Sequence, residues 1–175
     1  MKVSASTISP DLLTAELQAR GLHYLIGSLP APSSPRLADD VLLAGLARQE
    51  DARLRSALIP LFLSQPSLAR ALPRALSQLG PTEQTALKIY YTAAAILQSE
   101  FSDTLVAAYP QWRPLPDLYS EELGLRASDD ATQRLHQLGS IHARLTGSQV
   151  NWPGTYRHAA ERLIRRLQLE QRWAA

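Results

Sequence analysis

The sequence has 175 residues, of which 45% are hydrophobic and 19% charged, with a formal net charge of +2. This length and apolar content fit one globular domain with a buried core, and they argue against a disordered or low-complexity chain. Leu and Ala, which favour helices, supply 56 residues, whereas the β-branched Val and Ile supply 11, which argues against an all-β or doubly wound α/β fold.

Pro and Gly divide the first third of the chain into short segments. Ser9 and Pro10 predict the start of a helix that ends at Gly21, since Ser caps a helix, Pro suits its first turn and Gly adopts the left-handed conformation at its end. Residues 22–27 are expected to be helical or irregular. Three prolines within 29–36 predict a loop.

The next segment predicts helices over 38–48 and 51–63, the second interrupted at Pro60. Residues 50–79 together have the pattern of a helical hairpin and resemble a single HEAT-type repeat. One such unit is too short to form a solenoid, so we expect it to be part of a larger bundle.

The longest helix is predicted to start after Gly80 and to break near Ser102 and Asp103. Apolar residues recur along one of its faces at steps of three and four: Leu87, Tyr90, Ala94, Leu97, Phe101 and Leu105. A second apolar side indicates that this helix is central and covered by the others.

The rest of the chain predicts a Pro-rich loop at 110–117, a short helix at 118–123 and a helix that ends near residue 145, before Gly147. Acidic residues at 129–130 suit the start of that helix, because its dipole favours negative charge there.

Asn151 is expected to cap the last helix, with Pro153 in its first turn. One side of this helix is apolar: Trp152, Tyr156, Ala160, Leu163 and Leu167. The other side is basic: Arg157, Arg162, Arg165, Arg166 and Arg172. The sequence therefore predicts one all-α domain over 1–175, a bundle of six to eight helices with Pro-rich loops and a core over about 37–170, preceded by a helix and a Pro/Ser-rich loop within 1–36.

The sequence carries no recognisable catalytic or cofactor motif. Without Cys there is no disulfide or thiolate ligand, and the helical His136 and His142, six residues apart, point about 240° away from each other. No HExxH motif, P-loop or GxSxG motif occurs. We therefore expect no metal and no cofactor, and we favour a non-enzymatic function. An enzyme with an unfamiliar helical site around Asn151, Tyr156 and His158 stays open as an alternative.

The candidate interaction residues are Arg53, Arg55, Asn151, Trp152, Tyr156, His158, Arg162, Arg165 and Arg166. For the block 151–158 a structural role competes with a binding role, because Asn caps helices and aromatic residues pack in cores. Arg53 and Arg55 have the same two interpretations, since Glu50 and Asp51 are close enough to pair with them.

The basic side of the last helix has two functional interpretations. It suits the phosphates of a nucleic acid bound by the helix pair at 131–172, and equally the acidic surface of a protein. Glu161 and Glu170 interleave with the arginines, and any amphipathic helix shows a charged side to water. A protein partner is the leading hypothesis and nucleic acid the alternative; self-association stays open.

Five short blocks resemble an uncharacterised all-α family of cyanobacteria and Chloroflexi: EDARLR (50–55), YYTAA (90–94), LPDLY (115–119) with ELG (122–124), HARLTG (142–147) and NWPGTYRH (151–158). That family is encoded beside nucleotidyltransferase-like genes. The resemblance implies an accessory or antitoxin-like protein whose partner is a nucleotidyltransferase.

The N-terminal residues lack the apolar core of a signal peptide. The most apolar stretch, 86–97, is too short to cross a bilayer and contains Lys88. We expect a cytoplasmic protein without a membrane association.

Overall fold

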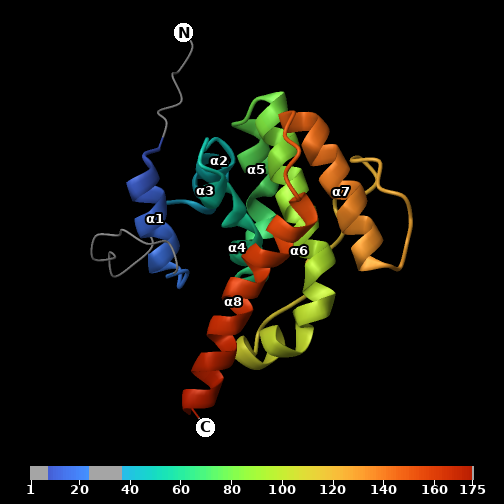
Figure 1. Cartoon of the computed structure of the whole chain (residues 1–175). Coiled ribbons are helices and arrows are strands. Elements are labelled where there is room, and N and C mark those ends of the chain that lie inside the picture. The colour runs from blue at the N-terminus through green and yellow to red at the C-terminus, as the bar shows by residue number, and fades with distance from the viewer. Residues whose placement is uncertain (1–7, 24–36, 175) are drawn as a thin grey trace.

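The structure, a computed structural model, describes residues 8–23 and 37–174. Within these ranges the chain is helical and contains no strand, which confirms the predicted all-α bundle (Figure 1). The helices are α1 (Pro10–Ala19), α2 (Asp39–Ala47), α3 (Ala52–Ser56), α4 (Leu58–Ser64), the 3-10 helix η1 (Pro66–Ala71), α5 (Leu72–Ser77), α6 (Pro81–Ala108), α7 (Ala131–Thr146) and α8 (Trp152–Ala174). Residues 24–36, where part of the 22–27 segment and the 29–36 loop were predicted, lie outside the described residues.

Helix α6 is the centre of the bundle, as its two apolar sides predict. It packs against α2, α4, α7 and α8. Its middle turns are buried on several sides, with Tyr90 and Tyr91 among the largest side chains of the core. Figure 1 shows α6 running through the molecule with α7 and α8 beside it.

The predicted helix caps are confirmed. The Ser9 hydroxyl accepts a hydrogen bond from the backbone N–H of Leu12, and the Asp130 carboxylate accepts from the first turn of α7. Gly21 and Gly147, which follow α1 and α7, both have positive φ. Short-range capping rules therefore place these helix ends correctly.

Three predicted boundaries were wrong. The break in 51–63 falls at Ala57 rather than Pro60, because Pro60 lies in the first turn of α4, where no N–H partner is needed. Helix α6 continues through Ser102 and Asp103 to Ala108. Residues 118–123 form turns instead of a helix, since Gly124 adopts positive φ after a single turn.

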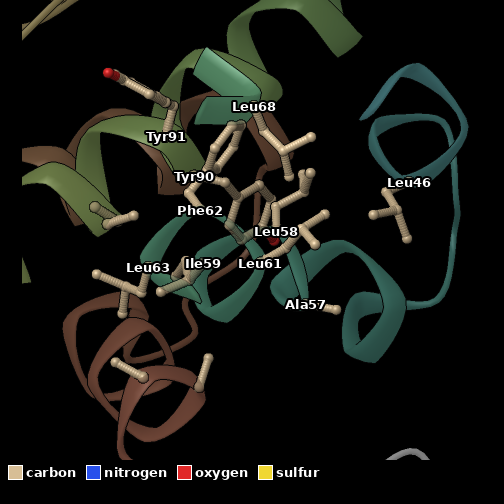
Figure 2. Packing of buried hydrophobic residues seen from close by; sticks show 14 of the residues in the cluster. Leu46, Ala57, Leu58, Ile59, Leu61, Phe62, Leu63, Leu68, Tyr90 and Tyr91 are labelled. Carbon is tan, nitrogen blue, oxygen red and sulfur yellow. The ribbon is translucent and has the colours of Figure 1, made fainter. Parts of the chain in front are cut away.

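The segment 50–79 does not fold as a simple hairpin. Helix α4 turns at Gln65 into η1, and α5 then packs mainly against α2. Figure 2 shows the apolar side chains of α4, including Phe62, gathered around Tyr90 and Tyr91 of α6. The rings of Phe62 and Tyr91 meet edge to face with centroids 5.0 Å apart. This packing fixes α4, and with it α3, against the side of α8.

Helix α1 is joined to α2 by one arginine. The Arg20 guanidinium pairs with Glu16 at 3.0 Å and with Asp39 at 2.8 Å, and it donates to the carbonyl of Leu37. The Glu16 side chain is 1% exposed and that of Arg20 7%. A buried charge needs compensation of this kind, so Arg20 links the N-terminal helix to the bundle.

Helices α7 and α8 approach closely where α8 begins. A Cβ atom added to Gly139 would lie 2.8 Å from Cδ of Pro153 and 3.2 Å from Cβ of Trp152. Glycine therefore lets the two backbones come together and sets the position of the first turn of α8.

Candidate functional site

A cleft of about 410 Å³ lies between α3–α4 and α8. We call it the α3–α8 cleft. Its lining residues are Ala52, Arg53, Ser56, Ala57, Pro60, Asn151, Gly154, Thr155, His158, Ala159 and Arg162. Four of the predicted interaction residues, from segments about 100 positions apart in sequence, meet here: Arg53, Asn151, His158 and Arg162.

Small side chains create the cleft. The small residues of the lining are Ala52, Ser56, Ala57 and Pro60 on the α3–α4 side, and Gly154, Thr155 and Ala159 on α8. Because none of these side chains reaches across, the two helices leave space between them. The lining is therefore largely apolar, with polar side chains contributed by Arg53, Asn151, His158 and Arg162.

Two hydroxyls in the cleft are already used by the backbone. Ser56 donates to the carbonyl of Arg53, and Thr155 donates to the carbonyl of Asn151. The Asn151 side-chain oxygen accepts from the N–H of Gly154 and caps α8 as predicted. The donors left to a ligand are therefore the Asn151 amide N–H groups and the side chains of the basic residues.

The basic residues of the cleft keep their donors available. Nε of Arg162 donates to Nε2 of His158 at 3.2 Å, which orients the guanidinium and leaves its terminal nitrogens unused by this contact. Within residues 8–23 and 37–174, neither Arg53 nor Arg162 forms an ion pair. The expected local pairing of Arg53 with Glu50 or Asp51 is replaced by a cap in which Asp51 accepts from the Arg53 backbone N–H.

Trp152 and Tyr156 lie in the core instead of the cleft. They are 5% and 0% exposed. His142 on α7 stacks on Trp152 and shares a hydrogen bond of 2.8 Å with the Tyr156 hydroxyl through Nδ1. The structure thus supports the structural interpretation of these two residues, which join α7 to α8.

Arg55 belongs to the same buried group and not to the cleft. Burial lowers the pKa of His142 to about 4, and the nearby Arg55 charge adds to this effect. Burial also raises the pKa of Tyr90, an increase that Arg55 partly offsets. Nε of Arg55, the Tyr90 hydroxyl and Nε1 of Trp152 are buried and have no hydrogen-bond partner in the part of the chain that the structure describes.

Ion pairs neutralise much of the basic side of α8. Arg157 pairs with Glu100 on α6, Arg165 with Glu161 at 3.6 Å, and Arg166 with Glu170 at 2.7 Å. Arg166 also donates to the carbonyl of Gly21. The predicted residues Arg165 and Arg166 are therefore paired, while Arg162 remains available at the cleft.

The exposed side of α8 also carries apolar residues that the sequence reasoning missed. His158, Arg162, Arg165, Leu169 and Trp173 follow one another at steps of three and four on this side, and we call them the outer stripe. Leu169 is 51% and Trp173 86% exposed. Leu169 and Trp173 could have been predicted from the sequence, because they continue the spacing of Arg162 and Arg165 at steps of four.

The described residues hold no group of three or more His, Asp or Glu side chains placed to bind a metal ion. None of the helices seen in 8–23 and 37–174 is long and apolar enough to span a membrane. Comparisons with protein-family models, with curated proteins and with solved structures gave no match. The site must therefore be interpreted from its own geometry.

Proposed function

We propose that this protein is a helical protein-interaction module that binds an acidic, amphipathic helix of a partner protein along the outer stripe of α8. The observation that carries the proposal is the stripe itself: basic residues at its start continue into exposed Leu169 and Trp173. Arg and Trp are the residue types that contribute most to binding at protein interfaces.

The shape of the stripe suits a helical partner. It covers 16 residues of a continuous helix, which corresponds to a length of about 22 Å. Figure 1 shows α8 crossing the bundle, with its last turns at the edge of the molecule near the C-terminus. A partner helix that lies along this side would contact residues of the stripe at steps of three and four.

Charge distinguishes a foreign partner from a second copy. The stripe contains no carboxylate, and of its two arginines Arg165 is already paired with Glu161. A second copy joined through this side would offer no acidic stripe residue to Arg162, which opposes association. A partner helix with acidic residues toward Arg162 and apolar residues toward Leu169 and Trp173 complements both halves.

The resemblance of the sequence to proteins encoded beside nucleotidyltransferase-like genes makes such an enzyme the first partner to examine. In that arrangement the protein would be an accessory or antitoxin-like subunit in the cytoplasm. Nucleic acid is the alternative ligand, and the ion pairs of Arg157, Arg165 and Arg166 reduce the positive charge available to it.

The test begins with the tagged full-length chain as bait in a lysate of the source organism. The captured partner is then purified and titrated against the wild type and the double variant Leu169→Ser, Trp173→Ser. We expect at least a tenfold loss of affinity, since each exposed apolar side chain that binding buries contributes about 1.5–3 kcal/mol. The variant Arg162→Glu should also bind more weakly than the wild type, and this difference in affinity should grow as the salt concentration is lowered.

The matched control is Leu118→Ser, because Leu118 is an exposed Leu outside α8. It should bind as the wild type does. The proposal is overturned if the stripe variants bind with unchanged affinity, if the captured material is removed by nuclease, or if sedimentation shows that the stripe joins two copies of this chain.

A further inference from the structure

We propose that the α3–α8 cleft is a binding site for a small organic oxyanion, a carboxylate or phosphate on a compact apolar body. This site adjoins the proposed partner surface, because His158 and Arg162 belong to both. It is formed by two walls, α3–α4 and α8, and its test requires no partner protein.

The first argument is that most of the free polar groups of the cleft are N–H donors, because the Ser56 and Thr155 hydroxyls keep only their oxygen lone pairs. The hydroxyls of Ser56 and Thr155 are used by carbonyl groups, and the Asn151 oxygen is used by the cap. Arg53, Arg162 and the Asn151 amide offer N–H groups only. Because Nε2 of His158 accepts from Arg162, the other ring nitrogen carries the proton. A ligand that satisfies these groups must supply acceptors.

The second argument concerns charge. Arg53 from α3 and Arg162 from α8 contribute two guanidinium groups to one cleft, and no Asp or Glu is among the lining residues. Neither arginine has an ion pair within the described ranges. Guanidinium groups match the geometry of carboxylate and phosphate oxygens, so the expected ligand is negatively charged.

The third argument concerns the walls. Ala52, Ala57, Pro60 and Ala159 present carbon atoms to a space of about 410 Å³. This volume is within the range of sites for small organic ligands. An inorganic ion would contact the polar side chains and leave the walls in water. A ligand with an apolar body covers them and gains the free energy of burying that surface.

The experiment uses the full-length protein and four probes: octanoate, octyl phosphate, octanol and inorganic phosphate. Binding is measured by isothermal titration calorimetry and by the rise in Tm. We expect the two charged amphiphiles to bind, with the tighter one identifying the headgroup. Octanol, which lacks the charge, and inorganic phosphate, which lacks the apolar body, should bind at least tenfold more weakly.

Two sets of variants separate the charge from the walls. The double variant Arg53→Gln, Arg162→Gln removes both guanidinium groups. The affinity for octanoate should fall about tenfold for each arginine removed. Ala52→Phe fills the cleft from an exposed position of α3 and should abolish binding with the arginines still present. The control Arg126→Gln with Arg144→Gln makes the same change of charge at exposed positions outside the cleft.

The proposal is overturned if neither amphiphile binds, if octanol binds as well as octanoate, or if the control pair weakens binding as much as the cleft pair. It is equally overturned if Ala52→Phe retains full affinity while its Tm is unchanged, because the ligand would then lie elsewhere. The five substitutions are all at exposed positions, so each of the three variants is expected to fold.

Discussion

The imidazole of His142 on α7 lies against the indole of Trp152 on α8, with ring centroids 3.6 Å apart and planes inclined by 20°. The same imidazole bonds the hydroxyl of Tyr156 one turn further along α8. One buried histidine thus joins α7 to the first turns of α8, the helix whose Asn151, Gly154 and Thr155 line the α3–α8 cleft.

Stability is expected to fall as the pH is lowered from 6.5 toward 4. The pKa of His142 is about 4 in the folded protein and near 6.5 when unfolded, so in this range the unfolded chain binds more protons. The contribution is complete above pH 6.5 and is lost as the pH falls. Urea unfolding should show a loss of about 2 kcal/mol between pH 7.5 and pH 5.

The pH effect should belong to one histidine. His142→Gln should flatten the dependence of the unfolding free energy on pH in this range. His136→Gln, an exposed position on the same helix, should leave it unchanged. Equal slopes for the wild type and His142→Gln would refute the assignment.

Two buried tyrosine hydroxyls should respond differently to removal. Tyr156→Phe takes away the partner of His142 and should destabilise the protein by about 1–3 kcal/mol. The Tyr90 hydroxyl has no well-formed hydrogen bond among the described residues and interacts only weakly with Arg55, so Tyr90→Phe should be close to neutral. Urea denaturation of both variants at pH 7.5 tests this, and equal destabilisation would contradict it.

Local signals in the sequence predicted much of the fold. Ser9, Asp130 and Asn151 each accept a hydrogen bond from the first turn of the predicted helix, and Gly147 ends α7. These rules depend on neighbours within four residues. Pro60 was misinterpreted because the same residue breaks a helix interior and suits a helix start, and only the preceding turn at Ala57 distinguishes them.

The site was predicted only in part, because it depends on distant packing. Arg53, Asn151, His158 and Arg162 were candidates, yet their meeting depends on how α4 packs against α6 and α8. Arg53 and Arg55 look equivalent in sequence. Because they are two positions apart on a helix, they lie on different sides of it, and Arg53 lines the cleft while Arg55 lies near Tyr90. The side chains Ala52 and Pro60 carry no chemical signal, although they make the cleft.

Replacement of Arg20 should weaken the attachment of α1. Arg20→Met keeps the hydrocarbon part of the side chain but removes the guanidinium from Glu16 and Asp39. Because the Glu16 carboxylate is buried, the expected loss is about 3 kcal/mol of unfolding free energy. Arg74→Met, at an exposed position of α5, is the control and should change stability little. If both variants unfold at the same urea concentration, the ion pair does not hold the helix.

The close contact between α7 and α8 predicts that Gly139→Ala destabilises the protein. In an ordinary helix, Gly→Ala stabilises by about 0.5–1 kcal/mol, because alanine restricts the unfolded chain and has the higher helix propensity. At Gly139 the new methyl group would lie 2.8 Å from the rigid ring of Pro153, so α8 must shift. We therefore expect Gly139→Ala to destabilise by about 1–3 kcal/mol in urea unfolding. Ser140→Ala, on the exposed side of the same helix, should be neutral or stabilising.

The same shift of α8 would move Asn151 and Thr155. Gly139→Ala should therefore also weaken the binding of octanoate, although Gly139 does not line the α3–α8 cleft. A Gly139→Ala protein with unchanged stability and full affinity would contradict this, because it would show that α7 and α8 accept the methyl group without moving.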